Sequence, residues 1–183
     1  MPSHIFTRVG YWKESIAANS ASVRAAKADI AKLAELRDKL REAKDAYWAE
    51  QVDIQWQTAN AWLLYAQGKY DEALAAMAAA AAAEDKTEKS PVTPGPIVPA
   101  RELYGAMLLE RGKAKDALAA FEATLKKEPH RLGATLGAAK AAEQAGDAGL
   151  ARQYYAAAVA LGEAAEPVRP EITAARAFVT KVN

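Results

Sequence analysis

The sequence contains no cysteine and only two histidines, His4 and His130. Without thiols the chain can form no disulfide and has no cysteine nucleophile, which is compatible with a reducing or an oxidising compartment. The two histidines fit no metal-binding spacing, so we expect no metal and no other cofactor. The sequence also lacks a phosphate-binding glycine loop and a serine in a nucleophile-elbow context. We therefore expect the chain not to be an enzyme.

An excess of one charge and a long apolar run are absent as well. The 24 basic and 23 acidic residues give a net charge of +1, whereas a nucleic-acid surface normally needs a basic stripe. No run of about 18 apolar residues free of charge is present, so we expect no membrane-spanning segment. The first ten residues have no basic segment followed by an apolar core, and we do not interpret them as a signal peptide. We expect neither a nucleic acid nor a membrane as partner.

What the sequence does contain is alanine in helical patterns. Hydrophobic residues make up 51% of the 183 residues, and many of them are alanine. Alanine is the strongest helix former but buries little area, so close packing of helix on helix is the best use of it. The length fits one compact domain or one short solenoid. We predict an all-α fold.

Three segments of the chain repeat one pattern. Each has an apolar helical stretch, a glycine, a small residue five positions later and a large residue four positions after that. The glycine ends the first helix, because a left-handed backbone is cheap only for glycine, and the small and large residues share one face of the second helix. A single hairpin cannot bury this face alone, so hairpins must stack. The glycines are Gly68, Gly112 and Gly146, the small residues are Ala73, Ala117 and Ala151, and the large residues are Met77, Phe121 and Tyr155. A weaker copy surrounds Gly10.

This pattern resembles the tetratricopeptide repeat, and the 34 residues from Gly112 to Gly146 match the length of that unit. The match is best in ELYGAMLLERGKAKDALAAFEATLKKEP, where seven positions agree with the family. These positions are Tyr104, Gly105, Leu108, Gly112, Ala117, Phe121 and Pro129. The resemblance implies an α-solenoid of stacked antiparallel hairpins. It also implies a concave groove, lined by the first helix of each hairpin, in which this family usually binds peptides.

A closer resemblance is to a group of bacterial tetratricopeptide-repeat proteins. It is carried by MPSHIFTRVGYWKESIAANSAS and by AYWAEQ, EKSPVTPGP and PARELYGAMLLERG. Members of this group are much longer, and many begin with an export signal. The resemblance implies that the chain is a C-terminal portion or an internally shortened form of such a protein, located in the cytoplasm or exported to the periplasm. The group has no settled activity to carry over.

A proline-rich segment, residues 90–99, separates two repeats. Gly68 and Gly112 are 44 residues apart, ten more than one repeat. Proline stops a helix and biases the residue before it to extended backbone, so we interpret this segment as a linker with Pro99 near the start of the next helix. The alternative is a docking peptide, because two PxxP motifs fall within the segment.

The stretch from residue 21 to residue 50 contains neither glycine nor proline. Its apolar residues recur at helical spacing, and Glu35 and Lys39 form an i, i+4 pair on the exposed side. We predict one long helix from about Lys13 to the low forties and a second helix over 45–67. The long helix packs on its own neighbours or pairs two chains as a coiled coil, and Arg37 and Lys44 on the apolar seam disfavour the coiled coil.

The end of the chain has the pattern of a capping helix. Pro170 starts this helix, and Ile172, Ala175, Phe178 and Val179 form one apolar face that covers the last hairpin. We predict one continuous solenoid with four regions. They are a degenerate repeat, long helix and hairpin over 1–89, a linker over 90–99, two repeats over 100–164 and a capping helix over 165–183.

We predict a non-catalytic protein-protein interaction module that binds a peptide or protein segment in the concave groove. The alternatives are a homo-oligomerisation element, such as a homodimer, and a small-molecule-binding or regulatory domain of a larger system. The resemblance gives as groove candidates His4, Thr7, Arg8, Gln55, Thr58, Trp62, Tyr65, Glu102, Ala106, Leu109, Leu136, Lys140 and Glu143. Trp62 and Tyr65 are the strongest of these, because aromatic side chains dominate binding hot spots. The alternative for Trp62 is that it packs the core between helices.

Overall fold

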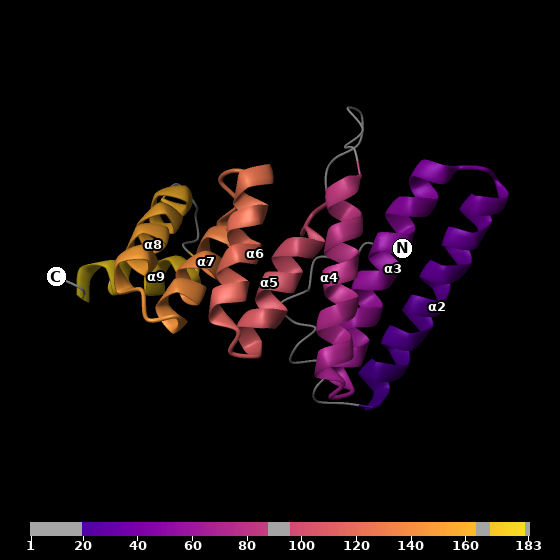
Figure 1. The fold of residues 1–183 in the computed structure, drawn as a ribbon, viewed down its shortest axis with the longest axis horizontal. Helices are drawn as coiled ribbons and strands as arrows, with labels where there is room; N and C mark the ends of the chain where they lie inside the picture. Colours follow the sequence, from indigo (N-terminus) through magenta and orange to yellow (C-terminus); the bar gives the residue numbers. More distant parts are fainter. Residues whose placement is uncertain (1–19, 88–95, 164–168, 182–183) are drawn as a thin grey trace. The chain divides into compact units, whose positions relative to one another are not determined.

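The structure is a computed structural model that describes residues 20–87, 96–163 and 169–181 (Figure 1). Within these ranges every regular element is an α-helix, which confirms the all-α prediction. The chain divides into two compact units, Met1–Ala100 and Arg101–Asn183. The first unit contains α2 (Ser20–Glu42), α3 (Ala46–Ala66) and α4 (Tyr70–Lys86). The second contains α5 (Ala100–Glu110) from its second residue on, α6 (Ala114–Lys127), α7 (Leu132–Gln144), α8 (Ala148–Gly162) and α9 (Pro170–Lys181).

Some sequence predictions fall outside the described residues. They concern the copy around Gly10, the start of the long helix at Lys13 and most of the proline-rich segment. The described part of that segment, residues 96–99, is not helical, and α5 follows directly after Pro99. The division of the chain into four regions and its continuity as one solenoid stay predictions.

Three hairpins turn on the glycines that the repeat pattern singled out. Gly68, Gly112 and Gly146 have φ angles of 77°, 70° and 83°, the left-handed backbone that suits glycine. At each turn two hydrogen bonds close the end of the first helix. In the last hairpin, for example, the Gly146 amide donates to the Glu143 carbonyl at 3.1 Å and the Asp147 amide donates to the Ala142 carbonyl at 3.0 Å. The predicted role of glycine at these turns is therefore confirmed.

The small and large residues after each glycine fill the hairpins as the pattern predicts. Ala73, Ala117 and Ala151 are fully buried. The Phe121 side chain, 3% exposed, lies against Gly105 of α5 and Gly137 of α7. A Cβ atom at Gly105 would lie 3.0 Å from the Phe121 ring, and one at Gly137 would lie closer still. Phe121 thus packs into a space that only two glycines leave open.

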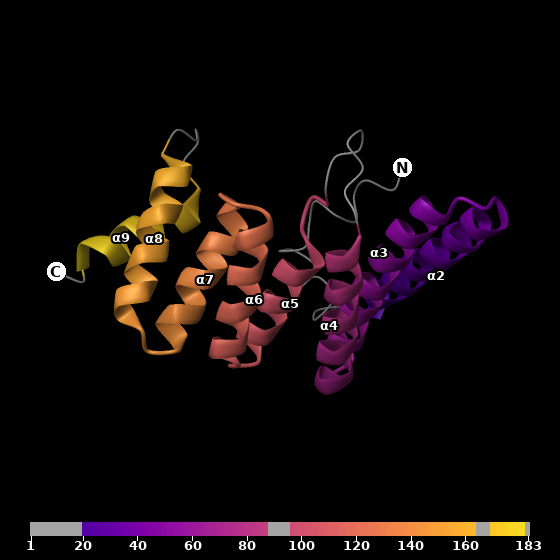
Figure 2. The ribbon, with the colours of Figure 1, turned by 45° about the horizontal axis from the view of Figure 1, so that its top comes forward.

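In the first unit, α3 lies between α2 and α4 (Figures 1 and 2). The long helix ends at Glu42 and the next helix extends from Ala46 to Ala66, in agreement with the predicted ends. Ala26 and Ile30 of α2 are buried, so the apolar seam of the long helix packs within its own chain. Glu35 and Lys39 form the predicted ion pair on the exposed side, with Oε1 and Nζ 2.6 Å apart.

The last helix covers the final hairpin of the second unit. Ile172 and Ala175 of α9 are fully buried, and Ile172 packs against Gly162 of α8. The Phe178 and Tyr155 rings lie with centroids 4.6 Å apart. The Arg152 side chain donates to the Val179 carbonyl at 3.0 Å, which satisfies a backbone acceptor in the last turn of α9. This helix is the predicted cap.

Candidate functional site

The first helices of the second unit, α5 and α7, lie on one side of α6. Gly105 of α5 and Gly137 of α7 both contact Phe121 of α6, which fixes this arrangement. Arg131, which precedes α7, donates from Nε to Glu102 Oε2 of α5 at 2.7 Å. The two first helices are therefore joined by an ion pair as well as by their shared contact with α6.

Of the candidates on α5 and α7, some are available to a partner and some are engaged. Lys140 is exposed, and Ala106 and Leu109 are half-buried. Glu102 is held by Arg131, and its carboxylate occupies the place that a Cβ atom at Gly133 would take. Leu136 lies in the buried cluster with Ala139 and Ala142. Lys140, Leu109 and Ala106 are thus the residues of this face with surface to offer.

Glu143 is exposed but accepts a hydrogen bond from the Tyr155 hydroxyl at 2.7 Å. Burial of the phenol, together with this carboxylate, raises the pKa of Tyr155 well above its usual range. The neighbouring Tyr154 donates to Glu122 Oε1 at 2.9 Å, and burial and that contact raise its pKa to about 12. Glu143 therefore has a structural role inside the last hairpin in addition to its place on the face.

The candidates of the first unit lie along one face of α3. Gln55, Thr58, Trp62 and Tyr65 follow at intervals of three, four and three residues, which places them in one line on the helix. Trp62 is 9% exposed, and its indole nitrogen is buried with no hydrogen-bond partner in the part of the chain that the structure describes. Gln55, Thr58 and Tyr65 are half-buried. His4, Thr7 and Arg8, the remaining candidates, lie outside the described residues.

The three aromatic residues at the end of α3 and the start of α4 form a series of edge contacts. The Trp62 and Tyr65 rings are 5.6 Å apart between centroids, and the Tyr65 and Tyr70 rings are 5.0 Å apart. Such edge-to-face pairs favour a fixed arrangement of the rings. Trp62 is therefore a packing residue of this series, and Tyr65 and Tyr70 present the accessible part of it.

A hollow of about 380 Å³ lies in the second unit between α6, the start of α7 and α8. Its lining is mostly apolar and consists of Leu125, His130, Thr135, Tyr154, Ala157, Ala160 and Leu161. Most of these residues belong to the second helices α6 and α8, His130 lies in the turn before α7, and Thr135 lies in the first turn of α7.

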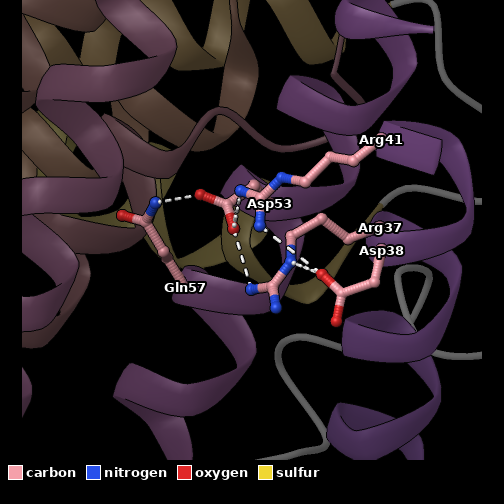
Figure 3. A network of polar contacts seen from close by, with 5 residues as sticks. All are labelled: Arg37, Asp38, Arg41, Asp53 and Gln57. Atoms are coloured by element: carbon pink, nitrogen blue, oxygen red, sulfur yellow. Dashed lines mark hydrogen bonds and ion pairs between the residues drawn. The ribbon is translucent and has the colours of Figure 1, made fainter. Parts of the chain in front are cut away.

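A network of charged residues joins α2 to α3 (Figure 3). The Asp53 carboxylate of α3 accepts hydrogen bonds from Arg37 at 3.0 Å, from Arg41 at 3.5 Å and from Gln57 at 2.8 Å. Asp38 of α2 accepts from Arg37 at 2.9 Å. From the sequence, Arg37 was predictable only as a charge on an apolar seam, and no local pattern marked Asp53 as its partner.

Across residues 20–87, 96–163 and 169–181 there is no cluster of three or more histidine or acidic side chains that could hold a metal ion. In the same ranges, every helix is too short or too polar to cross a membrane.

The profile of the tetratricopeptide repeat family matches residues 58–94 and 107–166, more than half of the chain. The chain therefore belongs to the tetratricopeptide repeat family. The crystal structure of PcrH from Pseudomonas aeruginosa is similar to this chain, with a TM-score of 0.56 and 19% sequence identity. The similarity covers 71% of this chain and 91% of PcrH, and it supports the fold. No curated protein matches the sequence.

Proposed function

We propose that the chain is a non-catalytic interaction module that binds a segment of a partner protein on the first helices of its hairpins. The observation that carries this proposal is the match to the tetratricopeptide repeat family over both of its hairpin segments. Modules of this family serve in protein interactions, and in the second unit the first helices α5 and α7 both contact Phe121 of α6.

In the second unit, exposure favours three of the candidate residues as partner contacts. Lys140 offers an exposed charge, and Leu109 and Ala106 offer half-buried apolar surface on the neighbouring first helix. Glu102 is neutralised by Arg131 and contributes less. In the first unit, Tyr65 is the aromatic candidate with accessible surface, whereas Trp62 supports it from the core.

Site-specific photo-crosslinking tests this proposal. A photoreactive amino acid at position 140 of α7 is expected to capture a protein partner in cells, with the cross-linked segment identified by mass spectrometry. The matched control carries the same amino acid at position 115, an exposed lysine of the second helix α6. Partner segments captured at 115 and not at 140 would refute the proposed face while leaving an interaction function intact.

Self-association through the long helix is the alternative, and it stays a prediction. This pairing is tested separately, because position 140 lies on α7 and not on the long helix α2. Light scattering at several protein concentrations is the independent measurement.

A further inference from the structure

The turn between α2 and α3 has the geometry of the three glycine turns although it contains no glycine. Lys44 has a φ angle of 60°. Its amide donates to the Arg41 carbonyl at 3.0 Å, and the Asp45 amide donates to the Leu40 carbonyl at 2.9 Å. These two bonds have the same spacing as those that close the helix at Gly146. Lys44 therefore occupies the glycine position of a fourth hairpin.

The residues after Lys44 continue the correspondence. The Asp45 side chain accepts from the Trp48 amide at 3.2 Å, as the Asp147 side chain accepts from the Leu150 amide at 2.9 Å. Ala49, five positions after Lys44, is buried like the alanines at this place in the other hairpins. The α2–α3 pair is thus a hairpin of the tetratricopeptide type, and α3 belongs both to it and to the α3–α4 hairpin.

The fourth hairpin has a charged pair at two interior positions where the other hairpins have uncharged residues. Seven positions before and nine positions after the turn residue, the other hairpins carry a small residue and a large one. These pairs are Ala61 with Met77, Gly105 with Phe121, and Ala139 with Tyr155. In the α2–α3 hairpin the same two positions hold Arg37 and Asp53, with Nη1 and Oδ1 3.0 Å apart. An ion pair stands where the repeat normally places a packing contact.

This ion pair is partly buried, and both of its side chains make further contacts. The Arg37 and Asp53 side chains are 17% and 24% exposed. The Arg37 guanidinium also lies over the Trp56 ring, 5.2 Å from its centroid, in a cation–π contact. Gln57 and Arg41 supply further hydrogen bonds to Asp53 (Figure 3). The network can therefore replace the missing apolar contact, but by electrostatic attraction.

We infer that raised ionic strength weakens the docking of α2 on α3, through the Arg37–Asp53 pair at the positions where the other hairpins carry a small and a large residue. Raising the salt concentration from 0.1 M to 1 M shortens the screening length from about 10 Å to about 3 Å, so the attraction between partly exposed charges weakens. Apolar contacts such as that of Phe121 with Gly105 are not weakened in this way. Salt therefore loosens α2 selectively.

Hydrogen exchange measured by mass spectrometry at 0.1 M and 1 M sodium chloride tests this inference on the whole chain. We expect the amides of α2 to exchange roughly threefold faster or more in 1 M salt, the size expected when a modest ion-pair contribution is screened. The amides of α6 and α8 in the same sample serve as the internal reference and are expected to change little. An equal change in all three helices would overturn the inference.

Three variants sharpen the test. Asp53→Asn keeps the shape of the side chain and removes its charge, so α2 is expected to exchange about tenfold faster at low salt and to lose its salt response. The double variant Arg37→Ala with Asp53→Met installs the pair found in the α3–α4 hairpin, and is expected to keep α2 protected at both salt concentrations. Glu35→Gln is the matched control on the outer side of α2, where its partners are Lys32 and Lys39 of the same helix.

The results for these variants distinguish the Arg37–Asp53 pair from other causes of a salt response. If Asp53→Asn retains the salt response of the original protein, the ion pair is not its cause and the inference fails. If Glu35→Gln abolishes the response, the outer charges of α2 are responsible and the inference fails as well. If Asp53→Asn does not fold, the double variant decides, because protection without a salt response supports the inference and a retained response contradicts it.

Discussion

In the α2–α3 hairpin the position nine residues after the turn holds Asp53, and in the α7–α8 hairpin it holds Tyr155. Both hairpins have the same turn, with an aspartate that caps the second helix and a buried alanine five residues after the turn residue. Asp53 is bound by arginine side chains from α2, whereas Tyr155 is buried against an apolar cluster. The two hairpins therefore have the same backbone geometry at the turn and differ in the side-chain contacts between their helices.

This difference separates two tasks that the repeat pattern combines. The turn requires one residue in the left-handed backbone and hydrogen bonds that close the helix, and Lys44 meets the requirement at a cost. The interior requires two residues that fit each other across the two helices. A guanidinium and a carboxylate meet this requirement in one hairpin, and a glycine and a phenylalanine meet it in another. The turn determines the geometry of the hairpin. The interior pair determines which conditions weaken the contact between its helices.

The largest effect is expected from removing the apolar filling. Phe121→Ala should lower the free energy of unfolding by about 3–5 kcal/mol, because it deletes a buried ring and leaves a cavity between two glycines. Urea unfolding followed by circular dichroism measures the change. Asp53→Ala, the corresponding change in the polar hairpin, should cost less globally, and an equal or larger loss would contradict the distinction drawn between the two interiors.

Smaller effects on the free energy of unfolding are expected at the turns, and they have opposite signs at Lys44 and at Gly146. Lys44→Gly should raise the free energy of unfolding by roughly 0.5–1 kcal/mol, because glycine adopts the φ angle of 60° without strain. Gly146→Ala, at the same place in the other hairpin, should lower it by about 1 kcal/mol. The same urea titrations provide both values. A stabilising Gly146→Ala would show that the two turns are not equivalent.

The smallest expected effect on stability at neutral pH comes from the two tyrosines of α8, because their ionisation changes stability only at alkaline pH. The pKa of Tyr154 is raised to about 12 and that of Tyr155 is raised further, whereas an unfolded tyrosine ionises at about 10. The folded state therefore holds these protons more tightly, so their contribution to stability is complete below about pH 10 and is lost as the pH rises through the folded values. Unfolding measured between pH 8 and 11.5 should show a falling stability.

The matched variant for this experiment is Tyr155→Phe. It keeps the ring in the apolar cluster and removes the hydroxyl that donates to Glu143. We expect a shallower loss of stability above pH 10 in the variant than in the original chain. Parallel curves for the two proteins would mean that Tyr155 does not account for the alkaline response.

The three glycine hairpins, the C-terminal end of the long helix and the capping helix were all predictable, because each has a local signature. Glycine at a turn, alanine five residues later and proline at a helix start act through the backbone and short-range packing. The fourth hairpin was hidden because lysine replaces glycine at its turn. The parallel between Asp45 with Ala49 and Asp147 with Ala151 was the remaining signal in the sequence.

The candidate groove was less predictable, because burial depends on neighbours that the sequence does not name. Trp62 and Tyr65 have equal claims in sequence, yet Trp62 is almost buried and Tyr65 is half-buried. Glu102 and Lys140 are both charged residues on first helices, but only Glu102 meets an arginine from the following turn. The groove itself stays a prediction until a partner is captured on it.

The sequence alone determined that this chain is helical and where its glycine turns lie, because propensity and backbone conformation act over a few residues. It also determined the repeat family, because the spacing of small and large residues survives in the linear order. Only the tertiary structure decided that Arg37 and Asp53 meet, that Phe121 lies between two glycines and that Trp62 packs inward. Those contacts join residues up to 16 positions apart on different helices, and their energies depend on burial and charge pairing that arise when the helices dock.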